Sequence, residues 1–70
     1  MYIIRKTELQ GVGVGYQMET NRGEDLLLIH YLDGRYEMFF CGSNKEIVSL
    51  LLEQNEVQIL AQLLNPDQGI

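Results

Sequence analysis

Alternating apolar and polar positions fill the first two thirds of the chain and predict β-strands. Residues 2–6 are rich in β-prone side chains and predict an opening strand, which Leu9-Gln10-Gly11 ends. The apolar positions then recur at every second residue, and residues 21–23 (Asn-Arg-Gly) signal a turn. We therefore expect a second strand whose one side carries Val12, Val14, Tyr16 and Met18.

A β-hairpin is predicted around Asp33-Gly34, which separates the apolar runs 26–32 and 35–41. Asp-Gly favours a two-residue type I′ turn, and a turn of that length fixes which residues pair. One hairpin face would pair Tyr31 with Tyr36, Ile29 with Met38 and Leu27 with Phe40, and we expect it to be the core. The other face mixes apolar and charged side chains, so either another element or a partner protein should cover it. This candidate interface pairs Leu32 with Arg35, His30 with Glu37 and Leu28 with Phe39.

The last third of the chain has two interpretations. Residues 43–46 (Ser-Asn-Lys-Glu) match a capping box, which favours one long helix over residues 44–64. The run 47–52 is equally typical of a buried strand, with a turn at 53–55 and a short helix over 55–64. Either helix would end before Pro66 and present an apolar stripe of Val57, Leu60, Ala61 and Leu64, widened by Ile59 and Leu63.

Size and charge limit the classes of function. Seventy residues form one small domain. The free energy gained by burying its apolar surface is about as large as the entropic cost of ordering the chain, so self-association would help to stabilise the fold. The net charge is −5, which disfavours contact with nucleic-acid phosphates and anionic lipids. No apolar run is long enough to span a membrane, and a single cysteine fits a reducing, cytoplasmic setting.

Few residues are candidates for chemistry. The expected His30–Glu37 pair lacks a nearby nucleophile, and a single histidine cannot build a typical zinc site. Cys41 is expected to be a small buried side chain. The glycines of residues 11–15 match neither phosphate-binding fingerprint and indicate a bent strand. We therefore expect no enzyme activity, no cofactor and no metal.

The order of these signals resembles the N-terminal domain of the cation/proton antiporter regulatory subunit family. The resemblance covers about residues 6–64, and each of its pieces is short. It is carried by Leu9-Gln10-Gly11-Val12-Gly13, by the alternating Tyr16 and Met18, by Gly23-Glu24, by His30 with Asp33-Gly34-Arg35-Tyr36-Glu37-Met38, and by residues 50–56 followed by 60–64.

The resemblance implies an α+β fold, with a mostly antiparallel sheet of four or five strands and one C-terminal helix packed on it. It favours the strand-then-helix interpretation of the last third. It also implies a non-enzymatic regulatory module of a potassium/proton antiporter, which pairs with itself as a homodimer and contacts the membrane transporter. Such a module would be cytoplasmic and peripheral at the inner face of the plasma membrane. The alternative is a stand-alone structural oligomerisation domain.

Several features depart from the family pattern. Gln10 stands where the family has a proline, and Tyr36 stands where it commonly has a basic residue. At the helix, Glu53 replaces a residue that caps an N-terminus better, and Asn65-Pro66 replaces a glycine-rich helix end. Family members continue into a TrkA-C-type (RCK C-terminal) domain that carries the nucleotide site for cyclic di-AMP, so we expect that site only in such a domain and not within these seventy residues. We expect one domain over residues 1–66 and a tail or linker over 67–70.

Overall fold

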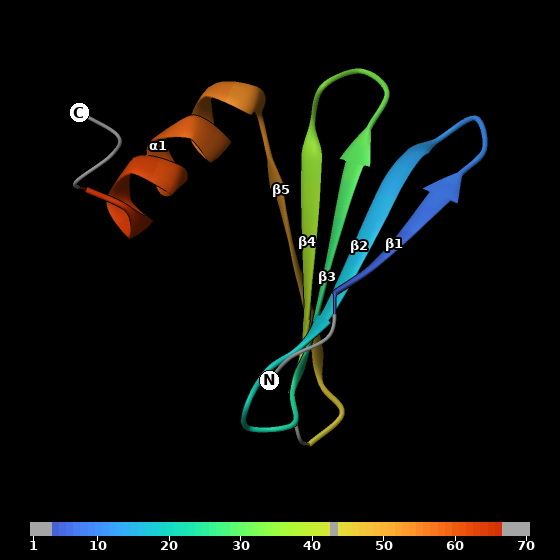
Figure 1. Ribbon diagram of the computed structural model, residues 1–70, viewed down its shortest axis with the longest axis vertical. Coiled ribbons are helices and arrows are strands. Elements are labelled where there is room, and N and C mark those ends of the chain that lie inside the picture. Colours follow the sequence, from blue (N-terminus) through green and yellow to red (C-terminus); the bar gives the residue numbers. More distant parts are fainter. Residues whose placement is uncertain (1–3, 43, 67–70) are drawn as a thin grey trace.

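A five-stranded antiparallel sheet followed by a single helix makes up the chain, as a computed structural model shows for residues 4–42 and 44–66. Each strand pairs only with its neighbours in the chain, so the sheet is a meander (Figure 1). The predicted α+β class is confirmed. The elements are β1 (Ile4–Leu9), β2 (Gly13–Glu19), β3 (Asp25–Tyr31), β4 (Tyr36–Cys41), β5 (Ile47–Leu52) and α1 (Gln54–Leu64).

The register sorts the side chains by the parity of their residue numbers. Ile4 pairs with Met18, Met18 with Leu26, Leu26 with Phe40 and Phe40 with Val48, so every pair joins two even or two odd residues. Because paired residues of a sheet point to the same side, all even strand residues share one face. We call this the even face; it comprises Ile4, Lys6, Glu8, Val14, Tyr16, Met18, Leu26, Leu28, His30, Tyr36, Met38, Phe40, Val48, Leu50 and Leu52.

The opposite side is the odd face. It contains most of the charged strand residues and both strand glycines. Its members are Arg5, Thr7, Leu9, Gly13, Gly15, Gln17, Glu19, Asp25, Leu27, Ile29, Tyr31, Glu37, Phe39, Cys41, Ile47, Ser49 and Leu51.

The hairpin between β3 and β4 has a three-residue loop, so the predicted two-residue turn is wrong. Tyr31 N–H donates to the Arg35 carbonyl at 2.8 Å, and Gly34 N–H donates to the Tyr31 carbonyl at 3.0 Å. Gly34 has φ 93°, the left-handed conformation that closes such a loop with a bulge. The extra loop residue shifts the pairing by one position, so His30 pairs with Tyr36 and Ile29 with Glu37.

This shift corrects both predicted hairpin faces. The six residues expected to form the core divide between the two faces: Tyr36, Met38 and Phe40 lie on the even face, whereas Leu27, Ile29 and Tyr31 lie on the odd face. A slip of one residue moves every side chain of a strand to the other side of the sheet. The hydrophobic face must therefore be read across the whole sheet and not from this hairpin alone.

The β4–β5 connection decides between the two interpretations of the last third. Residues 47–52 form β5, paired with β4 along its length, so the single long helix over 44–64 is wrong. Ser43, the first residue of the supposed capping box, lies outside the described residues, as do residues 1–3 and 67–70. A short helix follows the strand, as predicted, and Asn65 N–H donates to the Ala61 carbonyl where it ends.

The helix projects from the end of β5 rather than lying flat on its own sheet (Figure 1). Glu53 alone connects β5 to α1, whereas strand-to-helix connections in packed units commonly need two to six residues. The Glu56 carboxylate accepts a hydrogen bond from the Glu53 N–H at 2.8 Å, which fixes the start of the helix. Val57 and Leu60 of the helix are half-buried, whereas Ile59, Leu63 and Leu64 are exposed, so only part of its apolar surface is covered.

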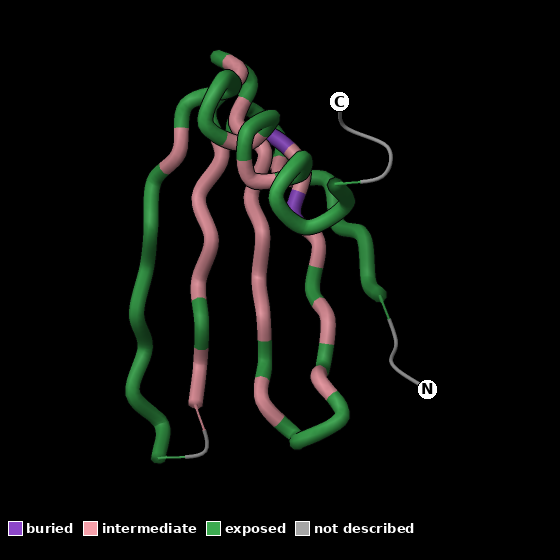
Figure 2. Tube along the Cα trace, turned by 90° about the vertical axis from the view of Figure 1, so that its left-hand side faces the viewer, coloured by how far each residue is buried: buried purple, intermediate pink, exposed green. Residues whose placement is uncertain are grey.

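No apolar side chain among the described residues is buried. The two buried positions there are Gly13 and Gly15 in β2, and the remaining strand residues are half-buried or exposed (Figure 2). Gly13 is required by a close approach, because a β-carbon there would overlap the carbonyl oxygen of His30. Cys41, expected to be buried, is half-buried. The strands are complete, but the hydrophobic layer that a sheet normally packs against is missing.

Candidate interaction surfaces

The even face is a continuous apolar surface that crosses all five strands. Its side chains are apolar or aromatic except for Lys6, Glu8 and His30. Phe40 is 42% exposed, Leu50 49% and Val48 60%, values far above those of core residues. An exposed apolar patch of this extent indicates an interaction site.

His30 lies within this surface, stacked on an aromatic ring. The His30 and Tyr36 ring centroids are 4.1 Å apart and the ring planes differ by 6°. The two residues are direct cross-strand partners on β3 and β4, which explains the contact. Val14 is the partner of His30 on the other side. The predicted His30–Glu37 pair is therefore wrong. His30 lies between Val14 and Tyr36 in a row of otherwise apolar and aromatic cross-strand partners.

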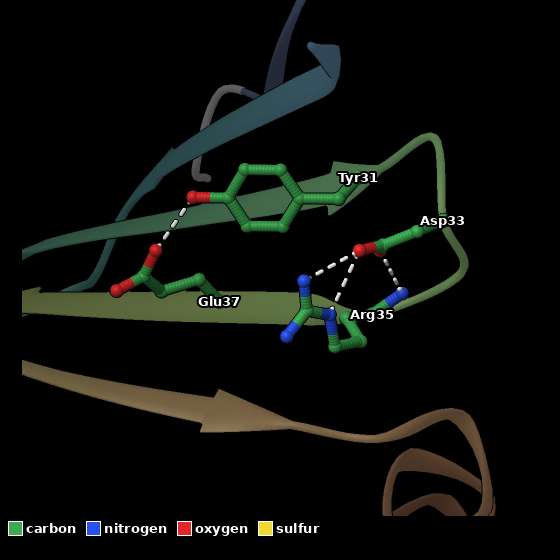
Figure 3. A network of polar contacts seen from close by, with 4 residues as sticks. All are labelled: Tyr31, Asp33, Arg35 and Glu37. Atoms are coloured by element: carbon green, nitrogen blue, oxygen red, sulfur yellow. Dashed lines mark hydrogen bonds and ion pairs between the residues drawn. The ribbon is translucent and has the colours of Figure 1, made fainter.

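Glu37 instead binds Tyr31 on the odd face. The Tyr31 hydroxyl donates to Glu37 Oε1 at 2.6 Å, across the diagonal between β3 and β4 (Figure 3). This hydrogen bond to the carboxylate, with the nearby negative charge and loss of solvent, raises the pKa of Tyr31. Sequence reasoning missed this pair, because the wrong register placed the two residues on opposite faces.

The hairpin loop carries an ion pair at its tip. Arg35 Nη2 lies 2.6 Å from Asp33 Oδ2, and Nε donates to the same oxygen at 2.9 Å. The Arg35 backbone N–H also donates to Asp33 Oδ1 at 3.0 Å (Figure 3). These hydrogen bonds from Arg35 hold the pKa of Asp33 below its ordinary value. Because both side chains are about half exposed, the pair orders the loop more than it stabilises the domain.

A smaller apolar hollow lies on the odd face. Leu27, Phe39 and Ile47 line it on β3, β4 and β5, with Gln17, Asp25 and Cys41 at its margins. The odd face thus has an apolar strip bordered by polar and acidic groups. It is less continuous than the even face, because Gly15, Gln17 and Glu37 interrupt it.

The six residues of the predicted interface do not share one surface. Leu28 and His30 lie on the even face, whereas Glu37 and Phe39 lie on the odd face. Leu32 lies in the hairpin loop and is 76% exposed, and Arg35 directly follows the loop. Reasoning from the sequence did not assign the even-face residues of β4 and β5, Met38, Phe40 and Leu50 among them, to an interface. The alternation within residues 47–52 was too weak to assign them to a face, because Leu51 and Leu52 are both apolar.

Two further properties concern the described part of the chain. No group of three or more histidine, cysteine, aspartate or glutamate side chains there could hold a metal ion. Its one helix is too short to cross a membrane. The polar contacts described above are an ion pair, a tyrosine–carboxylate hydrogen bond and local turn bonds.

Comparison with known proteins places this geometry in a family. No curated protein matches the chain. Residues 2–68 match the N-terminal domain of the K⁺/H⁺ antiporter subunit KhtT. The match includes every described strand and the helix, and it agrees with the resemblance carried by the glycine-rich turn and the Asp-Gly hairpin. The chain belongs to the family of the KhtT N-terminal domain, a regulatory subunit domain of K⁺/H⁺ antiporters and not a family of catalysts.

Proposed function

We propose that this chain is a non-catalytic regulatory module of a cation/proton antiporter that self-associates through its even face and contacts the membrane transporter. The uncovered apolar even face carries this proposal. The side chains along its centre run through Tyr16, Leu28, Met38 and Leu50 on four adjacent strands. Removing such a surface from water is the strongest driving force for association that the domain has.

Exposed area supports association. The chain exposes 5860 Å², whereas a folded monomer of this size is expected to expose about 4,500 Å². The surplus of about 1,400 Å² exceeds the ~800 Å² that each partner buries in a standard protein–protein interface. A dimer formed through the even face would give each chain the core that it lacks.

Contact with the transporter is assigned to the surface that remains free in such a dimer. This surface contains the apolar strip around Phe39 on the odd face and the end of the β3–β4 hairpin with Leu32 and Arg35. Glu37 of β4 lies next to it and binds Tyr31. The family description, a subunit of a K⁺/H⁺ antiporter, supports a membrane transporter as the partner. The chain would then reach the cytoplasmic side of the membrane through that partner.

Two substitutions on adjacent residues test which face self-associates. Leu27 and Leu28 are consecutive, half-buried residues of β3 that point to opposite faces. Leu28→Glu should shift the dimer to monomer in a light-scattering dilution series, whereas Leu27→Glu should leave the dimer intact. Dissociation by Leu27→Glu alone would assign self-association to the odd face, and a wild-type chain that is monomeric at every concentration would refute self-association.

The transporter contact has a separate test. Leu27→Glu and Phe39→Ser should abolish regulation of K⁺/H⁺ exchange in vesicles that contain the antiporter, while the protein remains a dimer. Unchanged regulation by both variants would refute the assignment of the odd face. A dimer that neither binds nor alters any antiporter would support the alternative of a stand-alone oligomerisation domain.

A further inference from the structure

The helix α1 exposes an apolar side of its own. Leu63 is 72% exposed, Leu64 71% and Ile59 54%, although the other side of the helix carries polar residues such as Gln58 and Gln62. Ile59 and Leu63 are one helical turn apart, so they form a continuous ridge. Isolated helices of 11 residues are marginal in water, which makes an uncovered apolar ridge a sign of a missing contact.

The chain's own even face cannot easily receive this ridge. A single residue, Glu53, joins the end of β5 to the start of α1, and the Glu56 hydrogen bond fixes the direction in which the helix leaves. This connection is shorter than the two to six residues that commonly join a strand to a helix packed flat on its sheet. The molecule thus presents two uncovered apolar surfaces, the exposed part of the even face and the ridge of Ile59 and Leu63, whereas Val57 and Leu60 on another side of the helix are half-buried.

We propose that two copies of the chain form a dimer in which they exchange their helices. The helix α1 of each chain packs on the even face of the other. This inference rests on the proposed self-association and names the element that completes it. A two-fold dimer repeats each contact twice, so one pair of complementary surfaces is enough to close the assembly. The helix is about 16 Å long and can cover a substantial part of a sheet of six-residue strands.

The distribution of charge on the two faces is compatible with a second copy of the chain as the partner of the even face. The whole chain carries −5, which opposes the approach of a second copy. On the even face, however, the charged residues are Lys6 and Glu8, which cancel and lie on the edge strand β1. The odd face carries Arg5 against Glu19, Asp25 and Glu37, a net negative charge. The face that can meet a copy of this acidic chain without repulsion is therefore the even face.

Isotope-filtered NMR tests the exchange on the whole chain. Carbon-13-labelled and unlabelled chains are mixed, unfolded and refolded together. The spectra are recorded at a concentration where light scattering shows dimers. Contacts between methyl groups of Ile59 or Leu63 in one chain and Leu28, Met38 or Leu50 in the other are expected between labelled and unlabelled chains. Helix-to-sheet contacts only within one chain, or none at all in a dimer, would overturn the exchange and leave self-association standing. A monomer at every concentration would refute both.

A pair of helix variants gives a second measurement. Leu63→Glu places a charge on the exposed ridge and should weaken dimerisation at least about tenfold. Gln62→Glu places the same charge on the polar side of the helix and should leave the dissociation constant unchanged. Equal effects of the two variants would show that the ridge is not part of the interface, whereas circular dichroism of each variant confirms that the sheet is intact.

Discussion

The rings of His30 and Tyr36 lie parallel, with centroids 4.1 Å apart, in the middle of an apolar surface. This stacking places the chain's single histidine where association would bury it, between Val14 on β2 and Tyr36 on β4. The nearest acidic residue in the same row is Glu8, one strand beyond Val14. A polar ring is costly to bury without a partner, and the stacking contact with Tyr36 is what accommodates His30 in this apolar row.

The Tyr31–Glu37 hydrogen bond should be visible in a tyrosine titration. The pKa of Tyr31 is raised because its neutral hydroxyl donates to the Glu37 carboxylate. The folded state thus favours the neutral phenol, and this contribution is present below about pH 10 and lost as the pH rises through the higher folded pKa. Glu37→Gln should shift part of the tyrosinate absorbance change to lower pH. The same substitution in a Tyr31→Phe background should have no such effect, which identifies the tyrosine concerned.

The Asp33–Arg35 pair predicts a small effect with the opposite pH dependence. The pKa of Asp33 is lowered by its hydrogen bonds from Arg35, so its contribution is present above about pH 4 and is lost as the pH falls through the lower folded pKa. Asp33→Asn should lower the melting temperature slightly at neutral pH, and the difference from wild type should vanish at strongly acid pH. Asp25→Asn, which removes a carboxylate from the other end of β3, is the control. A deficit that persists in acid would point to the loop backbone instead.

Substitutions at Gly34 test the backbone conformation of the β3–β4 loop. Its φ of 93° is strained for residues with a β-carbon, and asparagine tolerates it better than alanine. Gly34→Ala should destabilise the domain by about 1–2 kcal/mol, and Gly34→Asn by less. Urea denaturation at one protein concentration measures both. Equal stability of Gly34→Ala and wild type would contradict the positive φ at this residue, which the three-residue loop and a two-residue type I′ turn both require.

Much of the fold could be predicted from local signals. The turn at residues 21–23 and the alternation of Val14, Tyr16 and Met18 follow from side-chain preferences that act over a few residues. The end of the helix before Pro66 follows from the geometry of proline. These features are correct because no distant contact competes with them.

The register and the surfaces could not be predicted in the same way. Asp-Gly fits both a two-residue turn and the last two positions of a three-residue loop, and the hydrogen bond between Tyr31 and Arg35 distinguishes them. One residue of difference moved Met38 and Phe40 to the even face and separated His30 from Glu37. The apolar stripe of the helix predicted burial, but it could not show that Val57 and Leu60 would be half-buried while Leu63 and Leu64 stay exposed.

The meander order of the sheet also has a kinetic consequence. Every ladder joins consecutive strands, so the contact order is low and each hairpin can close without waiting for a distant segment. Strand pairing should therefore be fast and independent of concentration, whereas completion of the hydrophobic layer requires a second molecule. Refolding should show a rapid phase followed by a bimolecular one whose rate rises with protein concentration.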